Sequence, residues 1–173
     1  MLPSKSRTSE VTALAPGNDL LDDVNVALLA ELHAEPRITM SALGRRVGMS
    51  APAVTERVQR LERAGVIRGY RLEVDPAALG LPVTAFARIR PAPGQLPKVA
   101  ELAGRIAQVS ECHRITGEDC FLVKIHAAAV DRLDEILDKF LLYGNTVSSI
   151  VVTSPVPPRP LPVPGAEPVP GAD

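Results

Sequence analysis

Two short amphipathic segments separated by a single turn constrain this chain more than any other feature. They lie within Ile38–Tyr70, which runs ITMSALGRRVGMSAPAVTERVQRLERAGVIRGY. Thr39 is placed to cap a helix over Met40–Val47, and Gly48 suits the left-handed conformation that ends such a helix. Ser50 is placed to cap the next one. The spacing predicts two helices joined by a tight turn.

The flanking segments extend this pattern. A preceding helix is predicted over about Leu21–His33, where apolar residues recur at helical spacing. The helix after the turn is predicted to pack through Val54, Val58 and Leu61. The segment that follows, VIRGYRLEVDP, is predicted to form two short strands about Gly69, or one strand with a bulge there.

Positive charge is concentrated on the same stretch. Residues Arg37–Arg71 contain eight arginines and two glutamates, whereas the whole chain of 173 residues has a net charge of −1. A surface of this kind attracts phosphates with salt-dependent affinity. The caps, the turn, the wing and the basic face together predict a winged helix-turn-helix that binds DNA.

The candidate DNA contacts follow from this geometry. The first turns of a recognition helix usually meet base edges, and arginine or glutamine further along suits phosphates or guanine edges. Glu56 can accept from cytosine N4 or pair with Arg60 one turn later, and the sequence leaves both roles open. The predicted DNA-binding residues are Arg45, Arg46, Ser50, Ala51, Ala53, Thr55, Glu56, Arg57, Gln59, Arg60 and Arg68.

The second half of the chain has a different organisation. Strands are predicted from VTAFARIR, SECHRIT, CFLVKIHA and TVSSIVVTS, and helices from PKVAELAGRIAQV and VDRLDEILDKFLL. The order is βαββαβ, a ferredoxin-like fold of the α+β class. The helices are predicted to face inward through Val99, Leu102 and Ile106, and through Val130, Leu133, Leu137 and Phe140. Because the strands are nearly apolar throughout, we expect an apolar open sheet face that a second copy covers.

These motifs together resemble the Lrp/AsnC family of bacterial and archaeal transcription regulators over about Leu21–Thr153. The motifs are LDDVNxxLL, LGRRVGMS, VxxRVxRLERAGVIRGY and DPAALG, followed by the βαββαβ pattern. The resemblance implies a winged helix-turn-helix at the N-terminus and a RAM-type domain that binds an effector and oligomerises at the C-terminus. It also implies dimers that assemble into octamers or similar forms, with an amino acid or related metabolite bound between subunits.

The resemblance implies an effector site at the turn between the second and third strands. Family members often carry Gly-Asp-Tyr-Asp there, and this chain has Gly-Glu-Asp-Cys at 117–120. The usual Pro-Gly-Val near the last strand is replaced by residues 143–146, which two serines follow to give a hydroxyl-rich rim. In the alternative interpretation the two acids are ordinary solvated turn residues. The effector candidates are Gly117, Glu118, Asp119, Cys120, Ser148 and Ser149.

The expected domain ranges combine these observations. We expect a disordered leader over 1–19, the winged helix-turn-helix domain over 20–80 with its helix-turn-helix at about 40–59, and the ferredoxin-like domain over 81–154. Residues 155–173 are rich in proline and are expected to be an extended tail, either passive or partner-binding. No apolar run approaches the length that spans a bilayer and no signal peptide is evident, so a cytoplasmic location is expected.

The sequence gives little indication of a disulfide, a metal site or an enzymatic function. With a turn at 117–118, Cys120 falls opposite residue 115 and not opposite Cys112, so both cysteines are expected to be small buried hydrophobes, with a redox sensor as the alternative. His33, His113 and His126 lack metal-ligand spacing. No phosphate loop, nucleophile elbow or paired acids indicate an enzyme, and no cofactor is expected beyond a small effector.

The sequence therefore favours a sequence-specific transcriptional regulator whose partners are double-stranded DNA, further copies of itself and a small effector, with no membrane. Two other hypotheses stay open. One is an architectural protein that wraps or bridges DNA. The other is a metabolite-binding enzyme or carrier with a vestigial DNA module.

Overall fold

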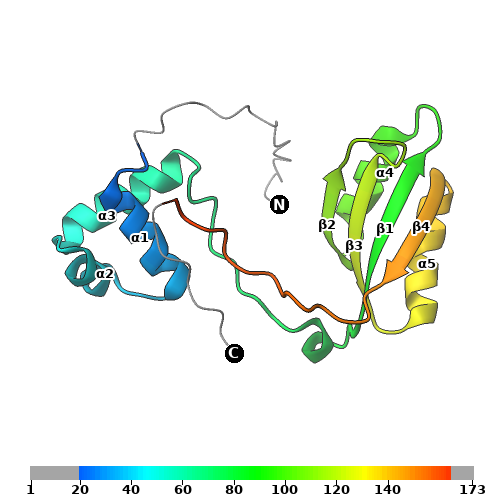
Figure 1. Cartoon of the computed structure of the whole chain (residues 1–173). Coiled ribbons are helices and arrows are strands. Elements are labelled where there is room, and N and C mark those ends of the chain that lie inside the picture. The colour runs from blue at the N-terminus through cyan, green and yellow to red at the C-terminus, as the bar shows by residue number, and fades with distance from the viewer. Residues whose placement is uncertain (1–19, 165–173) are drawn as a thin grey trace, which may run out of the picture. The chain divides into compact units, whose positions relative to one another are not determined.

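The structure is a computed structural model of the chain and describes residues 20–164 (Figure 1). The described residues divide into two compact units, 20–71 with 158–164, and 72–157. The expected leader over 1–19 and the end of the tail, 165–173, lie outside the described residues.

Three helices make up the described part of the first unit, and polar side chains fix where each begins. They are α1 (Asp23–Ala34), α2 (Met40–Val47) and α3 (Ala51–Arg63). The N–H donors of the first turns are satisfied by the side chains of Asp22 (2.7 Å), Thr39 (3.2 Å) and Ser50 (3.5 Å). The predicted caps and the left-handed end of α2 at Gly48, with φ 69°, are confirmed.

The helices pack around a core of aliphatic side chains. Leu28 and Leu32 of α1 meet Leu43 of α2 and Val54 and Val58 of α3, and all five are buried. Helix α2 also approaches the following turn closely. A Cβ added at Gly44 would lie 2.6 Å from the Met49 carbonyl oxygen, so only glycine fits there.

The segment after α3 differs from the prediction. Gly65, with φ 74°, ends the helix, and the N–H of Val66 bonds back to the Leu61 carbonyl oxygen at 3.0 Å. From there the chain is extended as far as the 3-10 turn η1 (Pro76–Leu79) and forms no strand. The expected wing strands about Gly69 are therefore wrong for the described residues. The backbone of Arg68–Val74 makes no hydrogen bond to another described backbone group, and a strand requires such a neighbour.

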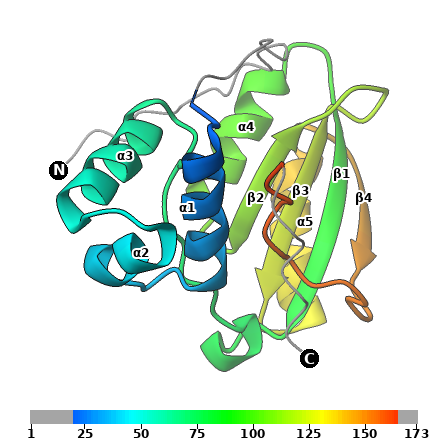
Figure 2. The ribbon, with the colours of Figure 1, turned by 60° about the vertical axis from the view of Figure 1, so that its left-hand side comes forward.

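The second unit is a four-stranded antiparallel sheet with two helices on one side, as Figure 2 shows. Its elements in chain order are β1 (Val83–Pro91), α4 (Leu96–Arg105), β2 (Val109–Arg114), β3 (Phe121–Ala127), α5 (Val130–Leu141) and β4 (Gly144–Ile150). The strands lie in the order β2-β3-β1-β4. The predicted βαββαβ pattern is confirmed.

The core of this unit lies between the sheet and its helices. Alternate residues of β1 and β3 are buried beneath Val99 of α4 and Phe140 of α5. One predicted core residue is wrong: Val130 is 59% exposed, whereas Ile136 is buried. Val130 is the first residue of α5, and the buried stripe of this helix begins one turn later at Leu133.

The open face of the sheet is more polar than expected. Strand β1 directs Thr84, Phe86, Arg88 and Arg90 away from the buried face, because side chains alternate along a strand. On β3 the residues of that face include Lys124, which pairs with Glu111 of β2 at 3.2 Å. The open face therefore combines apolar residues such as Phe86 with charged ones, and the expectation of a purely apolar face is wrong. The polar residues of VTAFARIR all lie at alternate positions, so they all point to the open face.

Candidate functional site

The first half of α3 presents the surface that was predicted to read bases. Ala51 and Ala53 are half-buried next to the Ser50 cap, whereas Glu56 and Gln59 are exposed. The Thr55 hydroxyl donates to the Ala51 carbonyl oxygen at 2.8 Å, so its hydrogen is held within the helix.

Glu56 and Arg60 form no ion pair with each other or with any other residue in 20–164. The ion pair between Glu56 and Arg60, which the sequence left open as an alternative, is therefore not formed in the structure. Both side chains are exposed, and their charged groups can meet a ligand without first leaving a protein partner.

Arg57 connects α3 to the start of α1. Its Nη1 donates to Asp22 Oδ2 at 2.7 Å and to Asn25 Oδ1 at 3.0 Å. Asn25 is fully buried, and its Nδ2 also donates to the Leu20 carbonyl oxygen at 2.8 Å. The hydrogen bonds from Arg57 and from the Asn25 N–H hold the pKa of Asp22 below its ordinary value.

Arg46 connects α2 to α1 in the same way. Its two terminal nitrogens contact Glu31 at 2.7 Å and Glu35 at 2.6 Å, and these bonds raise the pKa of the guanidinium. Two of the predicted DNA contacts, Arg46 and Arg57, are thus bound to acids of their own unit. These pairs were not predicted from the sequence, although acids at positions 31 and 35 share one helix face.

Other arginines of the basic stretch make no ion pair within 20–164. Arg45 lies in the last turn of α2, Arg60 and Arg63 lie in the last turn of α3, and Arg68 lies in the extended segment. All four are exposed. They are the groups of this unit best able to receive phosphates.

The turn between β2 and β3 carries the predicted effector residues. Gly117 has a φ of 106°, a conformation that favours glycine. Glu118 contacts Arg90, and the Asp119 carboxylate lies 3.9 Å from Arg88 Nε and 3.8 Å from Arg90 Nε. Two strand arginines therefore balance the two turn acids. Neither arginine was predicted from the sequence to take part in this site, although their spacing of two residues places both on one face of the strand.

The structure does not bring all the effector candidates together. Ser148 lies opposite Ala87 on the buried side of the sheet, and Ser149 lies opposite Phe86 on the open face. Adjacent residues of a strand point to opposite faces, so the two serines cannot line one rim. The β4 residues opposite Arg88 and Arg90 are Val147 and Asn145.

The two cysteines are unpaired thiols, as expected. The Ile115 N–H donates to the Cys120 carbonyl oxygen at 2.9 Å, and Cys112 lies opposite Val123, which confirms the predicted offset. Cys112 is exposed, so its expected burial is wrong. It lies on β2, an edge strand of the sheet.

Residues 20–164 contain neither a metal-binding cluster nor a helix suited to cross a membrane. No cluster of three or more His, Cys, Asp or Glu side chains has a metal-binding arrangement in this range. No helix in the same part of the chain is long and apolar enough to cross a membrane.

Two family descriptions match the two halves of the chain. The winged helix-turn-helix DNA-binding family matches residues 21–68, and the Lrp/AsnC ligand binding domain family matches residues 84–161. The HTH-type transcriptional regulator LrpA of Mycobacterium tuberculosis is 34% identical over 140 residues, which are 79% of this chain and 93% of the relative. The chain belongs to the Lrp/AsnC family. It is therefore a DNA-binding transcriptional regulator with a ligand-binding domain.

Further members of the Lrp/AsnC family agree with this assignment. The HTH-type transcriptional regulator LrpC of Bacillus subtilis is 32% identical over 76% of this chain and 91% of its own length. Its solved structure matches with a TM-score of 0.74 at 31% identity, covering 78% of this chain and 96% of that one. The leucine-responsive regulatory protein of Klebsiella pneumoniae is 32% identical over 73% of this chain and 79% of the relative.

Proposed function

We propose that this Lrp/AsnC regulator recognises specific DNA sites through α3 and responds to an amino acid bound at its ligand-binding domain. The observation that supports DNA reading best is the exposed surface of α3. There Glu56, Gln59 and Arg60 have no ion-pair or hydrogen-bond partner among the described side chains. Such groups can form hydrogen bonds with base edges in the major groove.

Within this interface we propose different roles for the arginines. Arg60 contacts a guanine edge or a phosphate, and Arg45 and Arg68 contact phosphates on either side. Arg46 and Arg57 hold α2 and α3 against α1 through the acids they bind. A DNA contact by either would require its guanidinium to be shared with those acids. We also propose that the DNA-binding domain spans residues 20–80 and the effector-binding domain spans residues 81–154.

The proposed effector is a zwitterion held at the Gly117 turn. The acids Glu118 and Asp119 suit an ammonium group, and Arg88 and Arg90 suit a carboxylate. The two signs of charge lie within one cluster. The name of the leucine-responsive relative supports an amino acid as the class of ligand. A thermal-shift screen of the free amino acids tests this assignment. Asp119→Ala is expected to weaken the binding of any amino acid that stabilises the protein in this screen.

We propose that the chain forms a dimer through the open sheet face, with larger assemblies built from dimers. Phe86 and Val147 are large apolar side chains on that face and are 37% and 52% exposed. A dimer would present two α3 helices, which matches the paired half-sites that helix-turn-helix proteins bind. By thermodynamic linkage, the effector can change the affinity for DNA only by as much as its own affinity differs between the assemblies.

Arg60→Ala tests the DNA interface most directly. It is expected to weaken operator binding by about 1–3 kcal/mol and, if Arg60 contacts a phosphate, to reduce the salt slope by about one. The measurement is binding of an operator fragment at several salt concentrations. Arg132→Ala is the matched control, because Arg132 is an exposed arginine of α5 bound to Glu135. Unchanged affinity and salt slope in Arg60→Ala would exclude the proposed interface.

An architectural role is the second candidate. It is favoured by exposed arginines spread over α2, α3 and the extended segment, which suit a path of phosphates longer than one half-site. Footprinting separates the two functions. A few phased protected sites support a regulator of specific promoters, and uniform protection of unrelated sequences supports DNA wrapping.

A further inference from the structure

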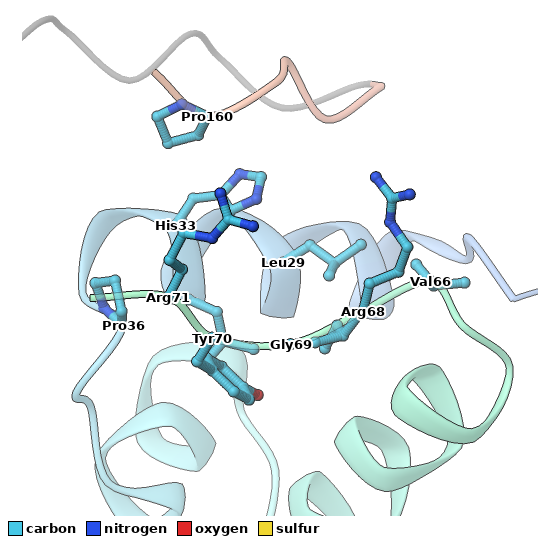
Figure 3. A pocket seen from close by; sticks show the side chains of 11 residues that line it. Leu29, His33, Pro36, Val66, Arg68, Gly69, Tyr70, Arg71 and Pro160 are labelled. Carbon is cyan, nitrogen blue, oxygen red and sulfur yellow. The ribbon is translucent and has the colours of Figure 1, made fainter. Parts of the chain in front are cut away.

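A cavity in the first unit is lined by no residue of α3. It has a volume of about 760 Å³, and its walls come from α1 and from Val66–Arg71 (Figure 3). Pro160, from the proline-rich segment, lies at its rim and belongs to the same compact unit. No cavity was predicted there from the sequence.

The walls combine an apolar surface with hydrogen-bond donors. Leu29 and Leu32 of α1 line the cavity together with Val66. In Figure 3 the side chains of His33 and Arg71 point toward the side on which Pro160 lies, whereas Tyr70 points the opposite way. The Tyr70 hydroxyl is held there by Glu62 at 3.2 Å.

Arg68 completes the donor set of this cavity. The side chains of His33, Arg68 and Arg71 make no ion pair with an acid in residues 20–164. The guanidinium groups can only donate hydrogen bonds. The cavity therefore suits a ligand that is apolar and rich in hydrogen-bond acceptors.

The proline-rich segment has that composition. Six of the ten residues 155–164 are proline, and each proline removes an N–H donor while keeping its carbonyl acceptor. Such a segment favours the polyproline II conformation, which has no internal hydrogen bonds and leaves its carbonyl groups open to other donors. A segment that already has this conformation loses little conformational entropy when it docks in a groove.

We propose that the cavity is a docking groove for residues 158–164 of its own chain. Pro160 already lies at the rim, and Val163 is half-buried whereas Leu161 is 79% exposed. Covalent attachment keeps the segment at a high effective concentration, so weak contacts suffice for docking.

One residue of the segment opposes docking. Arg159 carries a positive charge next to Pro160, and the groove presents two arginines. Like charges disfavour the contact, so replacing Arg159 by an acid is expected to strengthen it. This sign distinguishes docking in this groove from nonspecific collapse of the tail.

The first test uses the full chain without DNA. Amide NMR signals of Leu29, His33 and Gly69 are expected to shift in the variant P158A/P160A/P162A, and to stay in place in the matched variant P155A/P157A. Arg159→Glu is expected to shift the same signals in the opposite direction. Identical groove signals in all four proteins would overturn the proposal. Shifts that appear only on concentrating the protein would also overturn it, because the occupant would be the tail of a second copy.

The second test concerns regulation and rests on the proposed function. Arg68 is both a wall of the groove and a candidate phosphate contact, so docking and DNA should compete. The triple proline variant is expected to bind an operator about two- to fivefold more tightly, and Arg159→Glu more weakly than Arg159→Gln. Equal affinities would overturn the competition while leaving docking supported. Loss of DNA binding in every variant, with the NMR shifts intact, would reject the proposed function alone.

Discussion

At the scale of single residues, Gly44 sets how closely α2 approaches the turn before α3. The space for its missing Cβ is occupied by the Met49 carbonyl oxygen, 2.6 Å away. Gly44→Ala is therefore expected to destabilise the first unit by about 2 kcal/mol, because backbone atoms must move. The measurement is urea unfolding followed by NMR signals of α2. Gly104→Ala is the matched control, since a Cβ at Gly104 meets nothing within 4 Å. Equal effects of the two changes would contradict the packing argument.

Asp22 gives the first unit a pH dependence of known sign. Its pKa is lowered in the folded chain by Arg57 and by the Asn25 N–H. Stability from this carboxylate is therefore complete above the ordinary pKa of 3.8 and is lost as the pH falls through the folded-state value. Asp22→Asn keeps a good helix cap and removes the charge.

The expected result is a smaller loss of stability for Asp22→Asn than for the unchanged chain between pH 6 and pH 3. Urea midpoints of α1 signals at each pH provide the measurement. Asp138→Asn serves as the control, because Asp138 is an exposed carboxylate of α5 in the other unit. A pH dependence of α1 that Asp22→Asn leaves intact would assign the effect to other acids.

At the scale of elements, His126 joins three strands. Its Nδ1 lies 3.0 Å from the Thr84 hydroxyl of β1, and its Nε2 lies 3.0 Å from the Ser110 hydroxyl of β2. Burial lowers the pKa of the ring, and Lys124 lowers it further, against an opposing contribution from Glu111. The neutral ring is the form that the sheet favours.

The sheet unit should therefore lose stability in mild acid. The unfolded chain takes up a proton near pH 6.5, before the folded chain does, so stability is complete above that pH and falls below it. Amide hydrogen exchange of β3 between pH 7.5 and 5.5 measures the effect, after correction for the intrinsic exchange rate. His126→Gln, which retains hydrogen-bonding groups, is expected to abolish the dependence. Persistence of the same slope in that variant would rule out His126 as its source.

The elements also show which features a sequence can predict. The helix caps at Thr39 and Ser50 were predictable because each involves residues three positions apart. The predicted strands about Gly69 did not form, because a strand depends on a partner that no local pattern supplies. The pair between Asp22 and Arg57 spans 35 residues and was missed for the same reason. The open sheet face was predicted to be apolar because most residues of the strands are apolar. Side chains alternate between the two faces of a strand, however, and this alternation places both Arg88 and Arg90 on the open face.

At the scale of the whole molecule, the proposed dimer determines how many DNA-reading helices act together. Phe86→Glu is expected to convert dimers to monomers, because it places a charge at the centre of the open face. Light scattering coupled to size exclusion gives the molar mass. Leu142→Glu is the control, since Leu142 is 78% exposed at the end of α5. An unchanged mass for Phe86→Glu would move the dimer contact to another surface.

The unpaired backbone of Arg68–Val74 has a practical consequence. It contains two arginines in an extended, exposed segment, which is the form of chain that proteases accept. Trypsin should therefore cut after Arg68 or Arg71 before it cuts within the helices and would separate the two halves of the regulator. The rate of that cut would then report occupancy: whatever covers the segment, whether DNA, a docked tail or another subunit, would slow it.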